Sequence, residues 1–238
     1  MHRGLEPVPV ARNVSKRTRR GRPCHVFMSA KAGGLISMES YEEYKRALLL
    51  ELDPRVLCFS EQPWTMDVNS GEIRPTRDAF KPATAAMRFY TPDFTVCLAG
   101  GRILIIEVKN ALPSDERSEK YDLVRRRCQE NGYEFLMLEG AHLSTALLRN
   151  CEYLVRTSAE YLKKTLPEML ERLLELSQQR TCWTYAELAQ LAPQGGFGVF
   201  VGIAKGIFQA DLRSDLLMEE GLITPALGEL THLELGFV

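Results

Sequence analysis

The sequence predicts an α/β protein, in which a mixed sheet flanked by helices is followed by a small helical, winged-helix-like domain. Three observations lead to this prediction. Residues 37–138 follow the order helix, strand, strand hairpin, helix, strand. Residues 103–106 are apolar at every position, which is typical of a strand covered on both faces at the centre of a sheet. Two capping patterns after residue 160 indicate further short helices.

The first predicted helix covers residues 37–52, where apolar side chains recur with helical spacing and Asp53-Pro54 stops the pattern. Residues 56–59 form a short predicted strand. Residues 94–98 and 102–108 form two more, joined by a turn that contains Gly100 and Gly101. Residues 66–88 are polar and show no clear period.

A second helix is expected to open at residues 113–116, with acids in its first turn, and to end at Asn131-Gly132. Residues 133–138 read as the next strand. The mixed order of helices and strands indicates a sheet with helices packed against it.

The second domain is predicted from capping patterns at residues 165–168 and 184–187, each followed by helical spacing. Residues 199–210 are expected to be helical, and residues 216–223 to hold a turn at Gly221 and a short strand. We therefore expect a basic arm at 1–22, an α/β domain at 23–160 and a winged-helix-like domain at 161–238. The boundary is expected near residues 157–165.

The charge of the chain is nearly balanced overall but unevenly distributed. It has 30 Lys and Arg against 31 Asp and Glu, which excludes a uniformly basic protein of the kind that coats nucleic acid. The arm nevertheless carries seven basic residues and one acid. An anionic partner and a solvated tail both explain such an arm. With 45% apolar residues, the chain as a whole has the composition of a folded protein.

Cysteine and histidine usage gives no sign of a metal cluster or a disulfide framework, because the six cysteines and four histidines are widely spaced. We therefore expect a reduced, cytoplasmic protein. No apolar run is long enough to span a membrane, and no apolar stretch follows the basic arm as in a signal peptide.

Three polar residues surround the predicted hairpin. Glu107 and Lys109 lie two apart on one strand and share a face, and Asp93 immediately precedes the partner strand. If the hairpin centres on Gly100, Asp93 lies opposite Glu107 and all three side chains gather at one end of the sheet. A centre between Gly100 and Gly101 would turn Asp93 away unless a bulge corrects it. Both registers are compatible with the sequence.

Such a cluster would suit metal-assisted phosphodiester chemistry. Two carboxylates at one point repel unless a cation neutralises them, and hard oxygen ligands favour Mg²⁺. A nearby lysine could orient water or offset negative charge as it develops. The alternative is that Glu107 and Lys109 form only the polar rim of a buried strand.

Several separated motifs, in this order, resemble the TnsA family, the endonuclease subunits of heteromeric cut-and-paste transposases. The similarity covers about residues 37–138. It rests on Glu39-Ser40-Tyr41-Glu42-Glu43, Asp53-Pro54-Arg55-Val56, Glu61-Gln62-Pro63, Tyr90-Thr91-Pro92-Asp93-Phe94 and Ile106-Glu107-Val108-Lys109.

The resemblance implies a restriction-endonuclease-like fold with a helical, winged-helix-like second domain, and an active site at Glu43, Asp93, Glu107 and Lys109. Asp93, Glu107 and Glu43 would hold Mg²⁺, with Mn²⁺ as a substitute. Glu43 also fits a helix-capping pattern, and Glu39, one turn away, is the alternative helix carboxylate. Gln62 is expected to be structural.

The resemblance further implies hydrolysis of the 5′ strands of double-stranded DNA at transposon ends, with a TnsB-type transposase and a TnsC-type AAA+ regulator as partners and no membrane. A stand-alone restriction or repair endonuclease and a non-catalytic DNA or protein adaptor remain the alternatives. We expect phosphate contacts from basic residues of the arm and of the second helix, although those on the helix could also be a solvated face. These candidates are Lys16, Arg17, Arg19, Arg20, Arg125 and Arg126.

Overall fold

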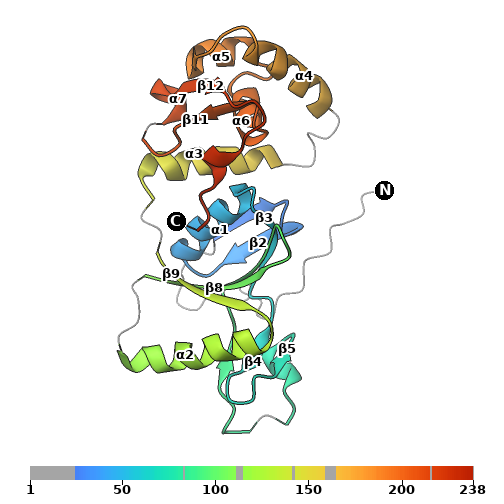
Figure 1. Ribbon diagram of the computed structural model, residues 1–238, viewed down its shortest axis with the longest axis vertical. Helices are drawn as coiled ribbons and strands as arrows, with labels where there is room; N and C mark the ends of the chain where they lie inside the picture. The colour runs from blue at the N-terminus through green and yellow to red at the C-terminus, as the bar shows by residue number, and fades with distance from the viewer. Residues whose placement is uncertain are drawn as a thin grey trace. The chain divides into compact units, whose positions relative to one another are not determined.

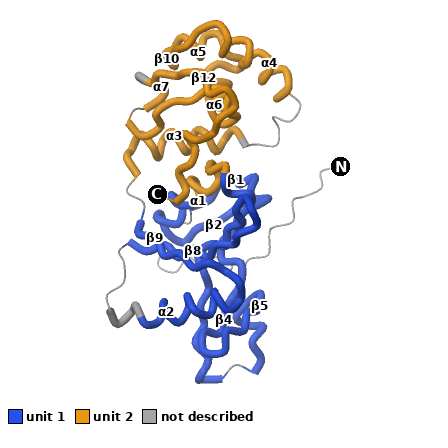
Figure 2. Tube along the Cα trace, in the orientation of Figure 1, with its two compact units in different colours: residues 1–46, 55–141 blue, residues 47–54, 142–238 orange. Residues whose placement is uncertain are grey.

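The computed structural model describes residues 25–82, 84–110, 115–140, 143–158, 165–214 and 216–237 (Figure 1). The chain separates into two compact units (Figure 2). The first takes residues up to 46 and residues 55–141, and the second takes residues 47–54 and those from 142 onward. Helices and strands occur in both units, which confirms the predicted α/β class. The predicted basic arm lies outside the described residues.

The first unit begins with an antiparallel hairpin of β1 (His25–Ser29) and β2 (Gly34–Met38), followed by α1 (Tyr41–Leu52), whose residues from 47 onward are counted with the second unit. The prediction of one helix over residues 37–52 was therefore wrong at its start. Residues 34–38 alternate between buried and more exposed side chains, as a paired strand does. Helical periodicity alone did not separate this short strand from the helix that follows it.

The main sheet of the first unit has four strands in the order β3-β7-β8-β9. The strands are β3 (Val56–Glu61), β7 (Phe94–Leu98), β8 (Ile103–Lys109) and β9 (Glu134–Glu139). β3, β7 and β8 pair antiparallel, while β8 and β9 pair parallel, so the sheet is mixed as predicted. β8 lies between two neighbours and residues 104–108 are all buried, which confirms the expected central strand.

Helix α2 (Asp115–Glu130) packs beside this sheet, and Figure 1 shows it next to β4. A second, three-stranded sheet in the order β5-β4-β6 is built from β4 (Thr65–Asp67), β5 (Ile73–Arg74) and β6 (Phe89–Tyr90). A 3₁₀ turn, η2 (Arg77–Ala79), precedes β6. Apolar side chains from α2, β4, β6 and β8 share one core cluster. It consists of Met66, Val68, Tyr90, Ile105, Tyr121, Val124 and Cys128.

The second unit contains mainly helices and one small sheet. The helical elements are α3 (Thr145–Val155), η3 (Arg156–Ser158), α4 (Leu166–Ser177), α5 (Tyr185–Leu191), α6 (Gly196–Ala204), α7 (Leu217–Glu220) and η5 (Thr231–Leu233). The strands β10 (Trp183–Thr184), β11 (Phe208–Ala210) and β12 (Leu222–Pro225) pair in the order β10-β12-β11. The predicted capping box at Thr184 and Glu187 is present. None of the described helices is long and apolar enough to cross a membrane.

Two details of the second unit differ from the predictions. The predicted helix over residues 199–210 ends at Ala204, because Gly206 adopts a φ of 68° and turns the chain into β11. The change of unit falls between residues 141 and 142 rather than near residues 157–165. Asn150 on α3 explains this, since its buried side chain bonds the Leu212 carbonyl and the Leu217 amide of the same unit.

Candidate active site

The strand register brings the predicted acidic residues together. Phe94 pairs with Ile106 and Cys97 with Ile103, so the β7–β8 hairpin centres on Gly100. Gly100 and Gly101 have φ values of 90° and 81°, a left-handed conformation that glycine adopts without steric cost. Of the two registers that the sequence allowed, the structure has the one that continues to Asp93 opposite Glu107.

Asp93 is held at the end of β7 by two backbone contacts. Its Oδ2 accepts a hydrogen bond of 2.7 Å from the Val108 amide, and its carbonyl accepts one of 3.0 Å from the Gln62 amide. Burial, followed by the charges of Glu107 and Glu43, raises the pKa of Asp93 to about 8 from an ordinary value of 3.8. A carboxyl with this pKa is mostly protonated at neutral pH unless a cation approaches it.

Glu107 lies in β8 with only 5% of its surface exposed and is surrounded by donors. The Tyr90 hydroxyl donates to Oε2 at 2.9 Å, and the Tyr121 hydroxyl donates to Oε1 at 3.3 Å. Burial and the Glu107 charge raise the pKa of both tyrosines, so both remain protonated donors at neutral pH. Glu107 is therefore fixed from two sides.

Lys109 completes this group, two residues along β8 on the same face. Its Nζ lies 2.5 Å from Oε1 of Glu107 and also donates to the Val108 carbonyl at 3.2 Å. Burial lowers the pKa of Lys109, but the Glu107 and Asp93 carboxylates outweigh that effect, so its pKa is raised. Lys109 therefore carries a positive charge at neutral pH and can stabilise negative charge rather than accept a proton.

Glu43 sits in the first turn of α1 and does two things. It caps the helix together with Ser40. Oε1 of Glu43 accepts a hydrogen bond from the Ser40 hydroxyl at 2.7 Å, and Oγ of Ser40 accepts one from the Glu43 amide. Oε2 of Glu43 accepts a further hydrogen bond from the Glu39 amide at 3.1 Å. It is also close enough to Asp93 to raise the pKa of that residue. Burial is the largest cause of the raised pKa of Glu43 itself. The structure thus brings Glu43 together with Asp93, Glu107 and Lys109.

The donors available for Mg²⁺ are Asp93 and Glu107. No group of three His, Cys, Asp or Glu side chains forms a metal site within the described part of the chain. Mg²⁺, however, is commonly held by one or two protein carboxylates together with water and substrate phosphate. Asp93 is crowded by two other carboxylates, and a cation would relieve that repulsion. The residues therefore fit a two-carboxylate magnesium site.

The three consecutive arginines of α2 have different surroundings. Arg127 bonds the carbonyls of Val68 and Asn69 and ties α2 to the segment after β4. Arg125 pairs with Asp122 at 2.9 Å and lies over the Phe135 ring. Arg126 is exposed and lines a pocket. Of the two candidates for DNA contact on this helix, Arg126 lines this pocket and Arg125 is already paired with Asp122. The candidates of the arm lie outside the described residues.

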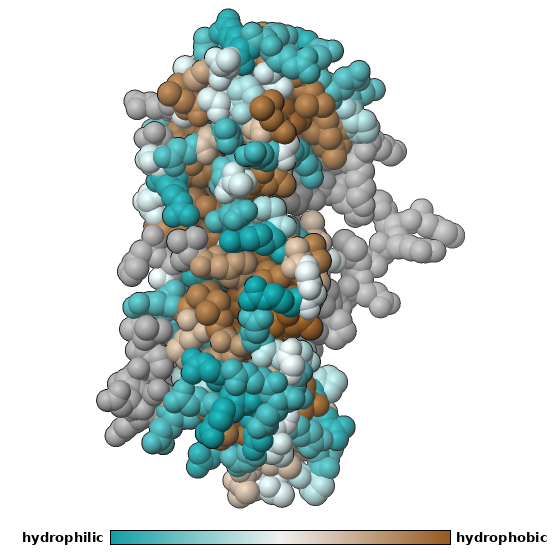
Figure 3. All heavy atoms as spheres, viewed as in Figure 1, coloured by the Kyte–Doolittle hydropathy of each residue, from teal (hydrophilic) through white to brown (hydrophobic). Residues whose placement is uncertain are grey.

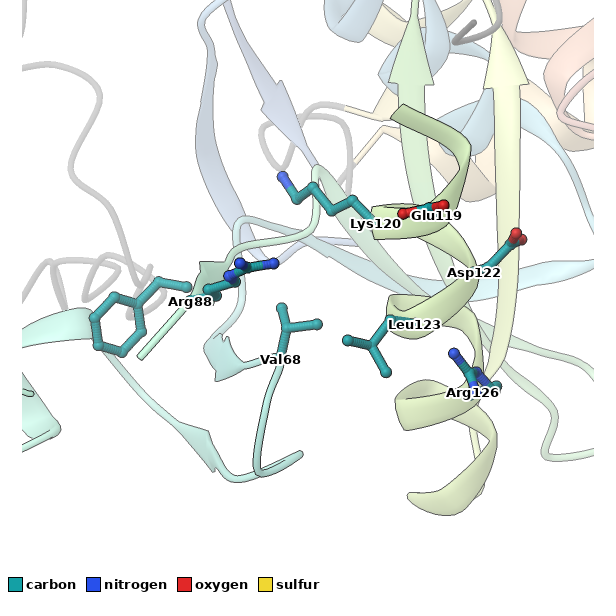
Figure 4. Close-up of a pocket in the computed structure, with 8 residues that line it drawn as sticks. Val68, Arg88, Glu119, Lys120, Asp122, Leu123 and Arg126 are labelled. Carbon is teal, nitrogen blue, oxygen red and sulfur yellow. The ribbon is translucent and has the colours of Figure 1, made fainter. Parts of the chain in front are cut away.

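This pocket has a volume of about 530 Å³ and lies between α2 and the β6 region. Its lining comprises Val68, Arg88, Phe89, Glu119, Lys120, Asp122, Leu123 and Arg126. In Figure 4 the Lys120 side chain extends from α2 toward Arg88, and Val68 and Leu123 face one another. Hydrophilic residues gather over α2 on the face shown in Figure 3. Arg88 immediately precedes β6, which carries Tyr90, and Lys120 immediately precedes Tyr121 on α2. The elements that line this pocket therefore also carry the two hydroxyls that bond Glu107.

Sequence reasoning missed the two tyrosines that bond Glu107, and also Glu61. Glu61 is buried at the end of β3, where Oε1 accepts from the Ser37 amide, and burial raises its pKa. Tyr90 had one available signal, since it stands in the motif that contains Asp93. Trp183 is 2% exposed and belongs to the core of the second unit.

Comparison with protein-family models finds no match for this chain, and comparison with curated proteins finds no significant match. The functional conclusion therefore depends on the geometry of the Asp93, Glu107 and Lys109 group.

Proposed function

We propose that this chain is a Mg²⁺-dependent DNA endonuclease with a restriction-endonuclease-like first unit, acting as the TnsA-type subunit of a cut-and-paste transposase. The observation that carries the proposal is the hairpin register, which gathers Asp93, Glu107 and Lys109 at one end of a mixed sheet. The motif resemblance of residues 37–138 supplies the family and the choice of the 5′ strand at transposon ends.

In the proposed reaction, water attacks a phosphodiester in line with the leaving oxygen. Asp93 and Glu107 would hold Mg²⁺, which when bound supplies positive charge at the phosphate and activates water. Tyr90 and Tyr121 hold Glu107 in place. Lys109, kept charged by Glu107, stabilises the negative charge that grows on the phosphate in the transition state.

Glu43 has a supporting role in this proposal. Both of its oxygens are engaged in capping α1, so its carboxylate is held still beside Asp93. Its charge raises the pKa of Asp93, and this repulsion favours a cation at the site. Glu39 supplies its amide to Glu43, so it positions Glu43 through its backbone.

The pocket between α2 and β6 supports contact with the DNA backbone. Arg88, Lys120 and Arg126 line it, and phosphate contacts from such side chains position a duplex without reading its sequence. Asp122, also in the lining, already pairs with Arg125 and so opposes an anion less. The elements that line this surface, α2 and the β6 region, also carry Tyr121 and Tyr90, which bond Glu107.

The second unit is better suited to bind a protein partner than to recognise DNA bases. Helices α4 to α6 followed by the paired β11 and β12 have the order of a winged-helix domain. In DNA-binding helix-turn-helix proteins the second helix of the pair reads the major groove. Here that helix, α6, carries no polar side chain and residues 198–203 are buried. We therefore assign this unit to docking of a TnsC-type AAA+ regulator, while a TnsB-type transposase cuts the 3′ strands.

The test is cleavage of end-labelled transposon-end DNA with Mg²⁺, by wild type and by Asp93→Asn, with and without a TnsB-type transposase. The proposal expects 5′-strand cuts that need the transposase and disappear in the variant. Cuts by the chain alone would instead identify a stand-alone restriction or repair nuclease. Absence of any Asp93-dependent cut would identify an adaptor and overturn the proposal.

A further inference from the structure

Two cysteines far apart in the sequence lie directly opposite each other in the main sheet. Cys58 on β3 pairs with Cys97 on β7 in the antiparallel ladder. The register of these strands shifts at Leu57, between the Val56–Leu98 pair and the Cys58–Cys97 pair. Without that shift Leu57, and not Cys58, would face Cys97. The irregularity in β3 is what brings the two thiols together.

The geometry of this pair suits a disulfide. Opposed residues of an antiparallel ladder project to the same face, with Cα atoms roughly 4.5–5.5 Å apart. A disulfide spans Cα separations of about 4.4–6.8 Å. Burial and a hydrogen bond with Cys58 raise the pKa of Cys97, which shows that the two side chains are in contact. The Cα separation typical of an opposed pair thus falls within the range that a disulfide spans.

The pair is also accessible to a reagent. Cys58 is exposed and Cys97 is half-buried, and β3 has β7 as its neighbour in the sheet and forms its edge. Cys128 and Cys151 are buried, and burial raises the pKa of each to about 12, so these thiols are unreactive. Cys182 is exposed as well, but it lies in the other unit.

We propose that Cys58 and Cys97 form a reversible oxidation site that reacts with a small disulfide of the glutathione type and closes into an intramolecular disulfide. The Cys58 thiolate attacks one sulfur of glutathione disulfide, forming a mixed disulfide and releasing one glutathione thiolate. The Cys97 thiol gives its proton to solvent and attacks the Cys58 sulfur, expelling the second glutathione thiolate. Two protein thiols are oxidised to one disulfide, and one glutathione disulfide is reduced to two glutathione molecules.

The bridge would cross-link the edge of the sheet to the strand that follows Asp93. It would close a loop of roughly 40 residues, and removing that freedom from the unfolded chain would raise Tm by about 8–16 °C. The site does not depend on the proposed nuclease activity, because it needs only the thiol pair and the oxidant.

The test uses the full chain carrying Cys24→Ser, incubated with glutathione disulfide, alkylated and mapped by mass spectrometry. The expected result is a cross-linked peptide pair containing Cys58 and Cys97, with two hydrogen atoms fewer than the reduced peptides. Cys182, which has no cysteine opposite it, should carry glutathione instead. The rise in Tm should be reversed by dithiothreitol.

Three single variants in the same background make the test specific. Cys58→Ser and Cys97→Ser should each lose the cross-link and the rise in Tm, whereas Cys182→Ser should keep both. Recovery of Cys58 and Cys97 as separate glutathione adducts, or as free thiols after full oxidation of Cys182, would overturn the proposal.

Discussion

Replacing Asp93 by asparagine should stabilise the protein while abolishing its proposed activity. The side chain keeps its shape, and its oxygen can still accept the hydrogen bond from the Val108 amide. The substitution removes the destabilisation of the folded state that arises because burial and the charges of Glu107 and Glu43 raise the pKa of the Asp93 carboxyl from 3.8 to about 8. At pH 7 this cost is at most about 4 kcal/mol, and we take about 2 kcal/mol, half of that ceiling, as the expected gain.

The sign of the pH dependence follows from the direction of the shift. Between about pH 4 and pH 8 the folded state holds a proton on Asp93 that the unfolded state has lost. Wild-type stability should therefore fall as the pH rises through this window, while Asp93→Asn lacks this contribution. The two proteins should be equally stable near pH 4.

Thermal unfolding of both proteins in EDTA, from pH 4.5 to pH 8.5, measures this effect. About 2 kcal/mol corresponds to a Tm that is roughly 4–8 °C higher for the variant at pH 7 in a chain of this size. Asp93→Glu, which keeps the charge, is the matched control and should not be stabilised. An Asp93→Asn variant that is less stable than wild type, or that follows the same pH profile, would refute the reasoning.

Three further predictions concern neighbouring residues. Tyr90→Phe should lower stability in urea unfolding by about 1–3 kcal/mol, because it leaves a buried carboxylate oxygen without its donor, and Tyr121→Phe should cost less since its bond is longer. Glu43→Gln should reduce the rate of single-turnover cleavage about 10²-fold. Its helix content should be unchanged, because the side-chain amide oxygen can still accept a hydrogen bond that caps α1. Full cleavage activity in this variant would show that Glu43 is not part of the site. Arg126→Ala should weaken duplex binding and lower its salt slope by about 0.9, whereas Arg125→Ala, already paired, should leave the slope unchanged; equal effects would contradict the assigned contact.

The hairpin shows how far the sequence could lead. The apolar run of β8 and the two glycines predicted both strands, since a strand buried on both faces has a local signature. The sequence did not determine the register of this hairpin, because shifting the pairing of two strands by one residue changes neither their composition nor their apolar pattern. The paired residues of the structure, Phe94 with Ile106 and Cys97 with Ile103, show which register forms.

The surroundings of Glu107 were less predictable still. Tyr90 and Tyr121 are separated from it by 17 and 14 residues, and nothing local to either one indicates that its hydroxyl will reach β8. Likewise the strands β5 and β6 have two residues each, which is too short for an alternating pattern to appear. These features arise from packing around α2 rather than from local preference.

The central claim is that Asp93 and Glu107 form one divalent-cation site, and calorimetric titration of Mg²⁺ or Mn²⁺ into the full chain tests it most directly. At pH 7, in two buffers with different ionisation enthalpies, wild type should bind the ion and release close to one proton, because the pKa of Asp93 is about 8 before binding. Asp93→Asn should bind far more weakly and release no proton. Equal affinity and equal proton release in the two proteins would contradict the claim.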